Sequence, residues 1–325
     1  MLENYMTLIE QLNKEWNREQ DIINVMAEIV RHNEPTKPKA EKYNIIEWFE
    51  KRLRWEYDDE IIPTGFKDID KRIFGAVKWN IMTIAARTWW WKTTLWINMA
   101  TNMTLAWYKV WFISLEMTEK EMWDKIISRY WKIRLSTLTR NKYFEWDINN
   151  YKENKDTIQK IIEWIKWDFN SYSIDEIQNS IEDMCSTWLD AVFVDWIWMI
   201  ECPWQTRQEQ IRKIMNTLKQ LATQKNIAVI AMQQMNRALQ EDTEPWPENI
   251  ADGSAIEKIS SPLILMWHSP SEVDTINMTL DKLRRINDTE FIWQPWWRNK
   301  FRTVTLKKNL WFCEFQDYED PTKAF

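Results

Sequence analysis

Short apolar segments alternate with longer segments of helical periodicity from residue 81 onward, and this alternation restricts the fold more than any other feature. Apolar runs that predict strands lie at residues 81–85, 110–114, 191–194, 227–231 and 263–266. Helical patterns lie between the first four of these runs, as at residues 93–104 and 208–224. Alternating strands and helices favour a mainly parallel sheet that is covered by helices on both faces. The sequence therefore predicts an α/β fold.

The segments on either side of this region have different patterns. Strand-like segments near the end predict an antiparallel meander, at residues 275–280, 301–306 and 311–315. Two amphipathic segments come first, at residues 3–33 and 44–57, and a proline-containing segment separates them. These two segments favour packing or a partner-helix surface over a catalytic role. We predict a helical appendage, a linker helix and a main domain, at residues 1–40, 41–60 and 61–325.

The segment after the first predicted strand carries the strongest chemical signal. It reads Ala86-Arg87-Thr88-Trp89-Trp90-Trp91-Lys92-Thr93-Thr94. A loop between a strand and a helix that ends in Lys-Thr is typical of a P-loop, which binds nucleotide phosphates at a helix N-terminus. The Lys92 ammonium would contact the β- and γ-phosphates, and the Thr93 hydroxyl would bind Mg²⁺. ATP and Mg²⁺ are therefore the expected cofactors, and the predicted cofactor-binding residues in this loop are Arg87, Thr88, Trp89, Trp90, Trp91, Lys92, Thr93 and Thr94.

Tryptophan at position 91 conflicts with this interpretation, because the tight backbone turn before the lysine ordinarily needs glycine. The whole chain shows the same excess of tryptophan and lack of glycine. It has 25 Trp and 3 Gly, whereas glycine ordinarily makes up about 7% of residues. We hypothesise that most tryptophan letters stand for glycine, as would follow if the source organism reads a codon such as UGA as glycine. A tryptophan-rich core or surface is one alternative. Another is a nucleotide site that is inactive because Trp91 is genuine.

Two carboxylates follow predicted strands where a nucleotide site needs them. Glu116 comes shortly after the strand at residues 110–114, and Asp195 ends the next strand of the pattern. Because ligands of open α/β sheets bind at the carboxyl ends of the strands, both side chains are expected beside the P-loop. We predict that Asp195 holds the Mg²⁺ shell and that Glu116 polarises the attacking water. Each residue taken alone is also consistent with a solvated loop acid.

Polar residues follow two further strands. Gln234 stands where a γ-phosphate sensor could lie, and the alternative is an amide that satisfies the loop backbone. Lys282 and Arg284 follow the strand at residues 275–280. They fit an arginine finger that reaches a neighbouring subunit's nucleotide, and equally a solvated charge run.

Composition limits the remaining function classes. The chain has 43 basic and 49 acidic residues, so bulk charge does not argue for nucleic-acid binding. The 3 Cys and 2 His are scattered, which suggests neither a zinc cluster nor a disulfide framework. No apolar stretch approaches the ~18 residues of a membrane span, and no leader pattern opens the sequence. We expect a soluble, cytoplasmic protein that does not enter membranes.

These motifs, in this order, resemble the C-terminal motor domain of bacterial replicative DNA helicases of the DnaB type, within the RecA-like family. The resemblance covers about residues 58–318, and Ser114-Leu115-Glu116-Met117 is its most specific segment. The other matching segments are Pro63-Thr64-Gly65-Phe66 with Asp70, Ile84-Ala85-Ala86-Arg87, Val194-Asp195, Gln234-Met235-Asn236-Arg237, Ser254-Ala255-Ile256-Glu257, Lys282-Leu283-Arg284, and Thr303-Val304-Thr305-Leu306 to Phe315.

The resemblance implies a RecA-like P-loop NTPase that forms a ring hexamer with ATP between subunits. It implies Glu116 as catalytic base, Gln234 as sensor, and Lys282 and Arg284 acting in trans. Single-stranded DNA would pass through the central channel, and primase or a helicase loader would be further partners. The residues it suggests for DNA contact are Asn236, Arg237, Asp252, Gly253 and Ser254. Glycine positions of the family fall on Trp79, Trp91, Trp107 and Trp188.

The expected function is an ATP-dependent replicative DNA helicase that translocates on single-stranded DNA. A RecA-like, DNA-dependent ATPase of recombination, repair or helicase loading, which does not unwind DNA, is the second hypothesis. A catalytically inactive binding protein is the third, and it applies if Trp91 is genuine. Two departures from the family pattern bear on these hypotheses. The family has an arginine shortly before its serine-isoleucine-glutamate segment, and residues 250–254 contain none. Residues 1–57 are also far shorter than the family's N-terminal domain.

Overall fold

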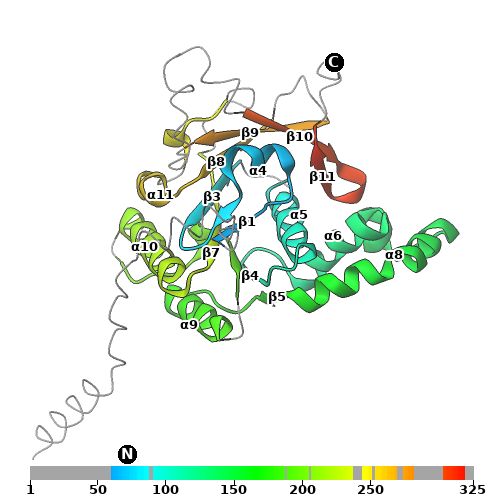
Figure 1. Ribbon diagram of the computed structural model, residues 1–325, viewed down its shortest axis with the longest axis horizontal. Coiled ribbons are helices and arrows are strands. Elements are labelled where there is room, and N and C mark those ends of the chain that lie inside the picture. Colours follow the sequence, from blue (N-terminus) through cyan, green and yellow to red (C-terminus); the bar gives the residue numbers. More distant parts are fainter. Residues whose placement is uncertain are drawn as a thin grey trace, which may run out of the picture. The chain divides into compact units, whose positions relative to one another are not determined.

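The computed structural model in Figure 1 describes the main domain of the chain. The chain divides into two compact units, Met1–Asp58 and Asp59–Phe325, and every described residue belongs to the second. The described residues are 60–87, 91–186, 189–204, 206–236, 244–250, 253–268, 274–281 and 303–318. The predicted appendage at residues 1–40 and most of the predicted linker helix lie outside them, so the predicted division at residues 40 and 60 stays a prediction.

A mixed sheet of nine strands forms the centre of the described domain, in the order β11-β10-β9-β8-β3-β7-β6-β4-β5. The run from β8 to β5 is parallel, and β9, β10 and β11 are antiparallel. The strands are β3 (Ile81–Ala86), β4 (Val110–Ser114), β5 (Ile165–Asp168), β6 (Ala191–Asp195), β7 (Ala228–Gln234), β8 (Leu263–Trp267), β9 (Thr275–Asp281), β10 (Thr303–Asn309) and β11 (Glu314–Asp317). A separate antiparallel pair, β1 (Ile61–Ile62) and β2 (Ala76–Val77), accompanies the sheet.

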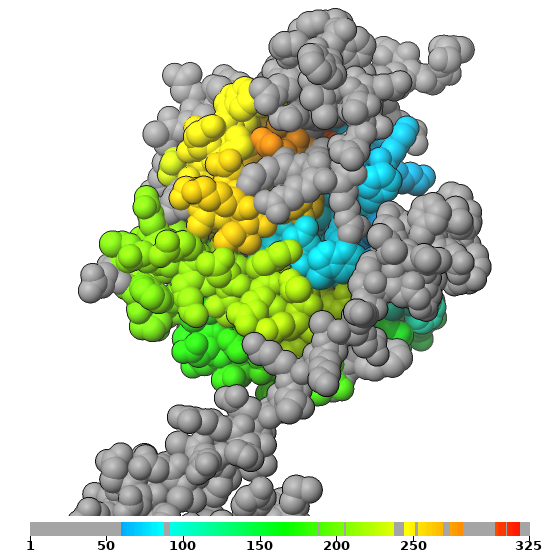
Figure 2. Space-filling view, turned by 60° about the vertical axis from the view of Figure 1, so that its left-hand side comes forward, coloured from blue at the N-terminus to red at the C-terminus, as the bar shows by residue number. Residues whose placement is uncertain are grey.

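Helices cover both faces of the sheet, as Figure 1 shows. The longer helices of one face are α5 (Trp91–Leu105), α6 (Glu119–Trp131) and α8 (Glu145–Trp164), with the short α4 (Lys67–Ile73) and α7 (Leu135–Arg140) nearby. The other face carries α9 (Ile174–Cys185), α10 (Arg207–Lys225) and α11 (Ser254–Ile259). Figure 2 brings this second face forward, and its helices form a surface that runs from green to yellow. Single-turn 3-10 helices complete the described chain at Ile197–Met199, Pro247–Asn249 and Leu310–Phe312.

Residues that alternate along the central strands build two separate cores. In β3, Met82 and Ile84 pack into the cluster on the α5 side, whereas Ile81 and Ala85 pack into the cluster on the α10 side. Successive side chains of a strand point to opposite faces, so a strand buried on both faces must be apolar at every position. All six residues of β3 are buried. This explains why the sequence shows continuous apolar runs there.

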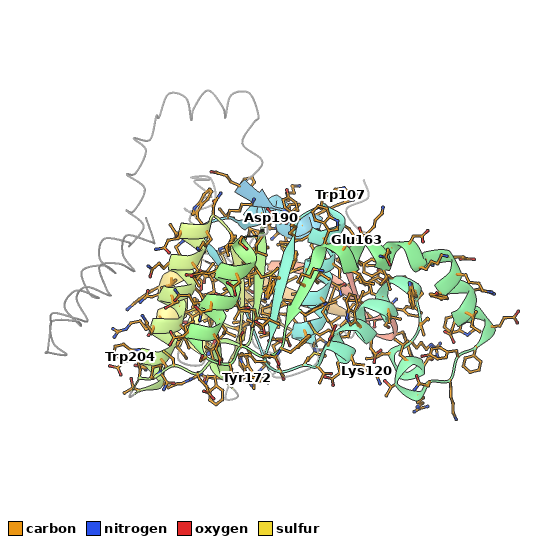
Figure 3. The ribbon with its side chains drawn as sticks, turned by 90° about the horizontal axis from the view of Figure 1, so that it is seen from below. Trp107, Lys120, Glu163, Tyr172, Asp190 and Trp204 are labelled. Atoms are coloured by element: carbon orange, nitrogen blue, oxygen red, sulfur yellow. The ribbon has the colours of Figure 1, made fainter. Side chains whose placement is uncertain are left out.

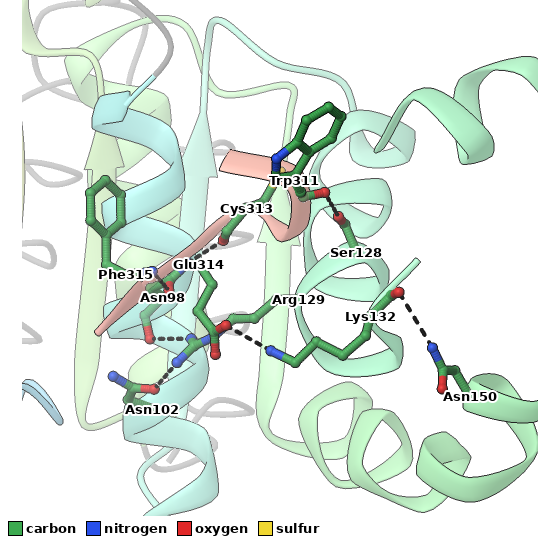
Figure 4. Close-up of polar contacts among 10 residues, drawn as sticks. All are labelled: Asn98, Asn102, Ser128, Arg129, Lys132, Asn150, Trp311, Cys313, Glu314 and Phe315. Carbon is green, nitrogen blue, oxygen red and sulfur yellow. Dashed lines mark hydrogen bonds and ion pairs between the residues drawn. The ribbon is translucent and has the colours of Figure 1, made fainter. Parts of the chain in front are cut away.

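Helix α5, which begins at the P-loop, is fixed to the end of the antiparallel meander by one buried asparagine (Figure 4). Asn98 is fully buried, and its amide nitrogen donates to the carbonyl oxygen of Cys313 at 2.9 Å. Its amide oxygen accepts from the backbone N–H of Phe315 at 2.9 Å. Arg129 of α6 adds a hydrogen bond to the Asn98 carbonyl at 3.0 Å. Asn98 therefore connects α5 directly to the hairpin between β10 and β11.

The predicted fold class is confirmed, including the parallel strands and the antiparallel closing strands. The predicted strand at residues 311–315 is wrong in position, because Leu310–Phe312 form a 3-10 turn and β11 begins at Glu314. Cys313 between them has φ of +48°, which an extended strand cannot include. Strand β5 was not predicted, since only Ile165 of its four residues is buried. None of the described helices is long and apolar enough to cross a membrane.

Candidate nucleotide-binding site

The parallel strands define two edges of the sheet, and the candidate site lies on the edge where these strands end. Figure 3 shows both edges by labelled residues. Residues that precede strands lie on one edge, namely Trp107, Glu163 and Asp190, and residues that follow strands lie on the opposite edge, namely Lys120, Tyr172 and Trp204. The start of α5 follows β3, so it belongs to the second edge, together with Glu116 and Asp195. The chain order of strands and helices therefore brings the predicted P-loop and both predicted carboxylates to one place.

Lys92 is the centre of this site. Its side chain is only 5% exposed, and its ammonium nitrogen lies 3.9 Å from the nearer carboxylate oxygen of Glu116, whose side chain is 43% exposed. The Lys92 ammonium donates no hydrogen bond within the described residues. A buried ammonium with unfilled donors is costly unless an anion satisfies it. The geometry therefore fits a lysine that receives phosphate oxygens.

Asp195 is the second buried charged group of the site. It is 1% exposed, and one of its carboxylate oxygens has no hydrogen-bond partner within the described residues. Burial raises the pKa of Asp195 to about 7, the nearby Lys92 ammonium opposes this shift, and the Glu116 carboxylate adds to it. A buried carboxylate with a free oxygen is a suitable ligand for a hard cation.

The turn after β4 places Glu116 beside Asp195. Ser114, the last residue of β4, pairs in register with Asp195 at the end of β6. The backbone N–H of Leu115 donates to the carbonyl of Asp195 at 2.8 Å. The N–H of Met117 donates to the Ser114 hydroxyl at 3.3 Å, so the serine closes the turn that carries Glu116. The motif Ser-Leu-Glu-Met thus combines a turn-closing hydroxyl with the carboxylate that is predicted to be catalytic.

The first turn of α5 supplies hydroxyl groups. Thr93 is 9% exposed and follows Lys92 directly. Mg²⁺ prefers oxygen ligands in a small octahedral shell that is completed by water and substrate phosphates. The Thr93 hydroxyl and the Asp195 carboxylate are the right donors for that shell, so the residues present fit the ion. Thr94 differs, because its hydroxyl accepts from the Lys125 ammonium of α6 at 3.3 Å.

The binding of Mg²⁺ with nucleotide is expected to weaken as the pH falls below about 7, because a proton then competes for Asp195. The raised pKa sets the sign: the carboxylate is neutral below about 7 and charged above it. The expected slope is about a tenfold loss of affinity for each pH unit below that pKa. Titration calorimetry between about pH 6 and pH 8 would measure it.

Asp195→Asn is the reference for this measurement, because nucleotide phosphates also titrate near pH 6. The variant retains the titration of the nucleotide and lacks that of the carboxylate. The slope of the unmodified protein should therefore exceed that of Asp195→Asn by about one proton. Equal slopes would show that Asp195 is already ionised in the nucleotide-free protein.

The structure places the predicted sensor and part of the predicted DNA contact at the same end of β7. Gln234 pairs in register with Ala86, the last residue before the P-loop segment. Asn236 is exposed, and its backbone N–H donates to the carbonyl of Asn249 at 2.7 Å. Gly253 and Ser254 lie only a few residues beyond Asn249, at the start of α11. Two segments predicted for DNA contact are therefore neighbours in space.

Several predicted residues lie outside the described ranges or carry no described contacts. Arg87 follows β3 and is half-buried. Trp91 begins α5, and only its backbone is described. Those outside the described residues are Thr88, Trp89, Trp90, Arg237, Asp252, Lys282 and Arg284.

Sequence reasoning missed one neighbour of Lys92, the predicted phosphate-binding lysine. The Trp196 indole lies over the Lys92 ammonium, with 4.6 Å between the nitrogen and the ring centroid. Trp196 follows Asp195 directly, so adjacency to a predicted ligand was the available signal. The sequence pattern alone did not predict that the Trp196 side chain would contact Lys92.

Comparison with known proteins identifies the family. The profile described as DnaB-like helicase C terminal domain matches residues 61–306, which is most of the chain. The chain belongs to the DnaB-like helicase family. Two solved structures share the fold. One is described as "The Structure Of A DnaB-Like Replicative Helicase And Its Interactions With Primase". It has a TM-score of 0.71 at 19% identity, and the match covers 98% of this chain and 76% of the solved chain. The other is described as an ATPase domain and has a TM-score of 0.71 at 20% identity, with coverage of 86% and 100%.

Curated members of the DnaB-like family resemble the chain over part of their length. A probable plasmid replicative DNA helicase of Chlamydia trachomatis serovar L2 is 28% identical over 234 residues, which cover 69% of this chain and 51% of the relative. The replicative DNA helicase DnaB of Rickettsia typhi is 28% identical over 287 residues, with coverage of 80% and 58%. The chain thus spans about half the length of the curated relatives that it matches.

Proposed function

We propose that this chain is an ATP-driven motor that translocates on single-stranded DNA as part of a replicative helicase. The observation that carries the proposal is the meeting of Lys92, Glu116 and Asp195 at the carboxyl edge of the sheet, with a 3.9 Å contact between the first two. Family membership supports the same function. ATP and Mg²⁺ are the cofactors that the chemistry of these residues favours.

The proposed roles follow from position and burial. Lys92 binds phosphate oxygens in a low-dielectric setting, where its charge acts strongly. Thr93 and Asp195 hold Mg²⁺, which neutralises charge on the transferred phosphoryl group when bound. Glu116 is more exposed than Lys92 or Asp195, so its carboxylate can reach a water molecule and orient it for attack. Gln234, at the end of β7 beside the P-loop strand, senses the γ-phosphate.

We also propose the assembly that family membership suggests. The chain would form a ring hexamer in the cytoplasm, with Lys282 and Arg284 of one subunit acting on the nucleotide of the next. Single-stranded DNA would contact Asn236, Arg237 and residues 252–254. Residues 41–60 would serve as a linker helix and residues 1–40 as a helical appendage. Primase or a helicase loader would be the protein partners, and one structure that shares the fold is described with primase.

A fork-unwinding assay with protein from the natural source tests the proposal. We expect strand separation that requires both ATP and Mg²⁺ and fails with a non-hydrolysable ATP analogue. Hydrolysis that single-stranded DNA stimulates, without strand separation, would instead favour the RecA-like ATPase of recombination, repair or loading. Absence of both nucleotide binding and hydrolysis would favour an inactive binding protein and would contradict the proposal.

A further inference from the structure

A second lysine lies beside the first turn of α5, and it comes from a different helix. The Lys125 ammonium of α6 donates to the Thr94 hydroxyl at 3.3 Å, in a partly buried place. Thr94 is 4% exposed and follows Thr93, the residue predicted to bind Mg²⁺. Lys125 itself is half-buried. The N-terminus of α5 thus has one lysine of its own, Lys92, and a second that α6 brings to it.

Arg129 holds α6 in a fixed position along α5. It lies one turn after Lys125 on the same face of α6, because residues four apart are neighbours on a helix surface. Its buried guanidinium donates to the Asn98 carbonyl at 3.0 Å, the Thr101 hydroxyl at 2.8 Å and the Asn102 amide oxygen at 2.7 Å. Figure 4 shows the first and the last of these bonds. Lys125 therefore reaches α5 from a helix whose register along α5 is set by packing.

The charge of Lys125 is not neutralised by the groups around it. Within the described residues it forms no ion pair. The Glu121 carboxylate, one turn earlier on α6, accepts from the N–H and the hydroxyl of Thr118, and these bonds hold the pKa of Glu121 below its usual value. Burial raises the pKa of the nearby Cys313 thiol, which is therefore neutral. An ammonium has three donors, so Lys125 retains donors for an anion.

The two lysines serve different sides of the α5 N-terminus. Lys92 lies 3.9 Å from Glu116, on the side of the predicted catalytic carboxylates. Thr94 comes two residues later, and this turns its side chain about 200° around the helix axis. Its carbonyl accepts from the Asn98 amide, which also donates to the Cys313 carbonyl. The side of α5 that Lys125 contacts is thus the side of the hairpin between β10 and β11.

We propose that Lys125 binds the α-phosphate of the nucleotide. The proposal rests on the proposed function, because it takes a nucleoside triphosphate as the ligand of the site. The γ-phosphate must lie near Glu116 for water to attack it, and Lys92 on that side holds the β- and γ-phosphates. The phosphate chain then crosses the N-terminus of α5 away from Glu116. The α-phosphate meets Lys125 on the far side, beside Thr94.

This contact contributes to binding and not to the chemical step. The charge on the α-phosphate does not change while the γ-phosphoryl group is transferred, so Lys125 stabilises the bound substrate and the transition state equally. An interaction of that kind lowers KM and leaves kcat unchanged. A role in the packing of α6 against α5 would instead alter kcat, because the turn that carries Glu116 leads directly into α6.

Lys125→Met tests the proposal, in a full-length chain that carries glycine at positions 79, 91, 107 and 188, where the family has glycine. Methionine keeps an unbranched stem and loses the charge. We expect the affinities for ATP and ADP to fall alike, by about tenfold, a change that corresponds to about 1.4 kcal/mol. KM should rise by the same factor, and kcat should stay within about threefold of the parent chain. Titration calorimetry and steady-state hydrolysis would measure these effects.

Two variants are the controls. Lys125→Arg keeps the charge and should retain most of the affinity that Lys125→Met loses. Lys120→Met is the matched control, because Lys120 is an exposed residue of the same helix and lies on the same edge of the sheet (Figure 3). It should bind ATP as tightly as the parent chain.

Sulfur in place of one non-bridging oxygen of the α-phosphate gives a readout that packing does not affect. Sulfur accepts a hydrogen bond from an ammonium less well than oxygen does. One diastereomer of this ATP analogue should therefore bind the parent chain more weakly than ATP does. In Lys125→Met the analogue and ATP should bind equally.

The outcomes separate this proposal from the proposed function. Unchanged affinity in Lys125→Met, an equal loss in Lys120→Met, or a large fall in kcat at unchanged KM would overturn the role of Lys125. A parent chain that hydrolyses ATP would keep the proposed function in each of these cases. A parent chain that binds no nucleotide would contradict both.

Discussion

Replacement of Glu116 by glutamine is expected to lower the rate of ATP hydrolysis about 10²–10⁴-fold, the range for loss of a general base. The side chain keeps its size and loses the carboxylate that would take the proton of the attacking water. Nucleotide binding should remain within about threefold of the parent chain, because the residues proposed to bind the nucleotide and its Mg²⁺ are Lys92, Thr93 and Asp195. Single-turnover hydrolysis and equilibrium binding of a fluorescent nucleotide would measure the two effects, in a chain that carries glycine at positions 79, 91, 107 and 188, where the family has glycine.

Two further variants serve as controls for this result. Glu119→Gln is the control, because Glu119 lies at the start of α6 and accepts a hydrogen bond from Trp123. It should hydrolyse ATP at the parent rate. Lys92→Ala should lose both binding and hydrolysis, since it removes the ammonium that meets the phosphates. Unchanged turnover in Lys92→Ala would contradict the prediction of a P-loop at this position. Unchanged turnover in Glu116→Gln would show that Glu116 is not the general base.

Replacement of Asn98 by leucine is expected to lower the free energy of unfolding by about 3 kcal/mol. Leucine fills a similar volume but leaves the carbonyl of Cys313 and the N–H of Phe315 without their hydrogen bonds in a fully buried place. An unpaired buried backbone group costs about 1–3 kcal/mol. Urea unfolding followed by circular dichroism would measure the loss.

Asn154→Leu is the matched control for this variant. Asn154 lies on α8 and donates to the Asn150 carbonyl of its own helix at 3.0 Å, in a partly exposed place. Its replacement should change the free energy of unfolding by no more than about 0.5 kcal/mol. If both variants lost the same small amount, the hairpin between β10 and β11 would not depend on Asn98 for its attachment to α5.

The candidate site was largely predictable from sequence because its residues follow strands directly. In a parallel sheet every strand ends at the same edge, so Lys92, Glu116 and Asp195 had to meet once the strands were recognised. The prediction needed no knowledge of side-chain packing. Gln234 followed by the same reasoning, and its pairing opposite Ala86 agrees with it.

Other parts of the fold were not predictable because their sequence signals are weak or depend on distant partners. Strand β5 is a short edge strand, and its pairing with β4 supplies the order that its own composition does not. The 3-10 turn at Leu310–Phe312 comes shortly before Phe315, whose backbone N–H donates to the distant Asn98 side chain. A segment whose conformation is decided by its attachment site carries little local pattern.

By itself, the sequence determined the α/β class, the order of the functional residues and the conflict between tryptophan and glycine, because periodicity, spacing and composition are local properties. Only the tertiary structure decided which side chains share a volume. It buried Asp195, and this burial raises the pKa of Asp195 to about 7 although the neighbouring Lys92 ammonium opposes the shift. It placed the Trp196 ring over the Lys92 ammonium and gave Trp79 and Trp107 a left-handed backbone. These properties arise from groups brought together by packing, and packing depends on the whole chain.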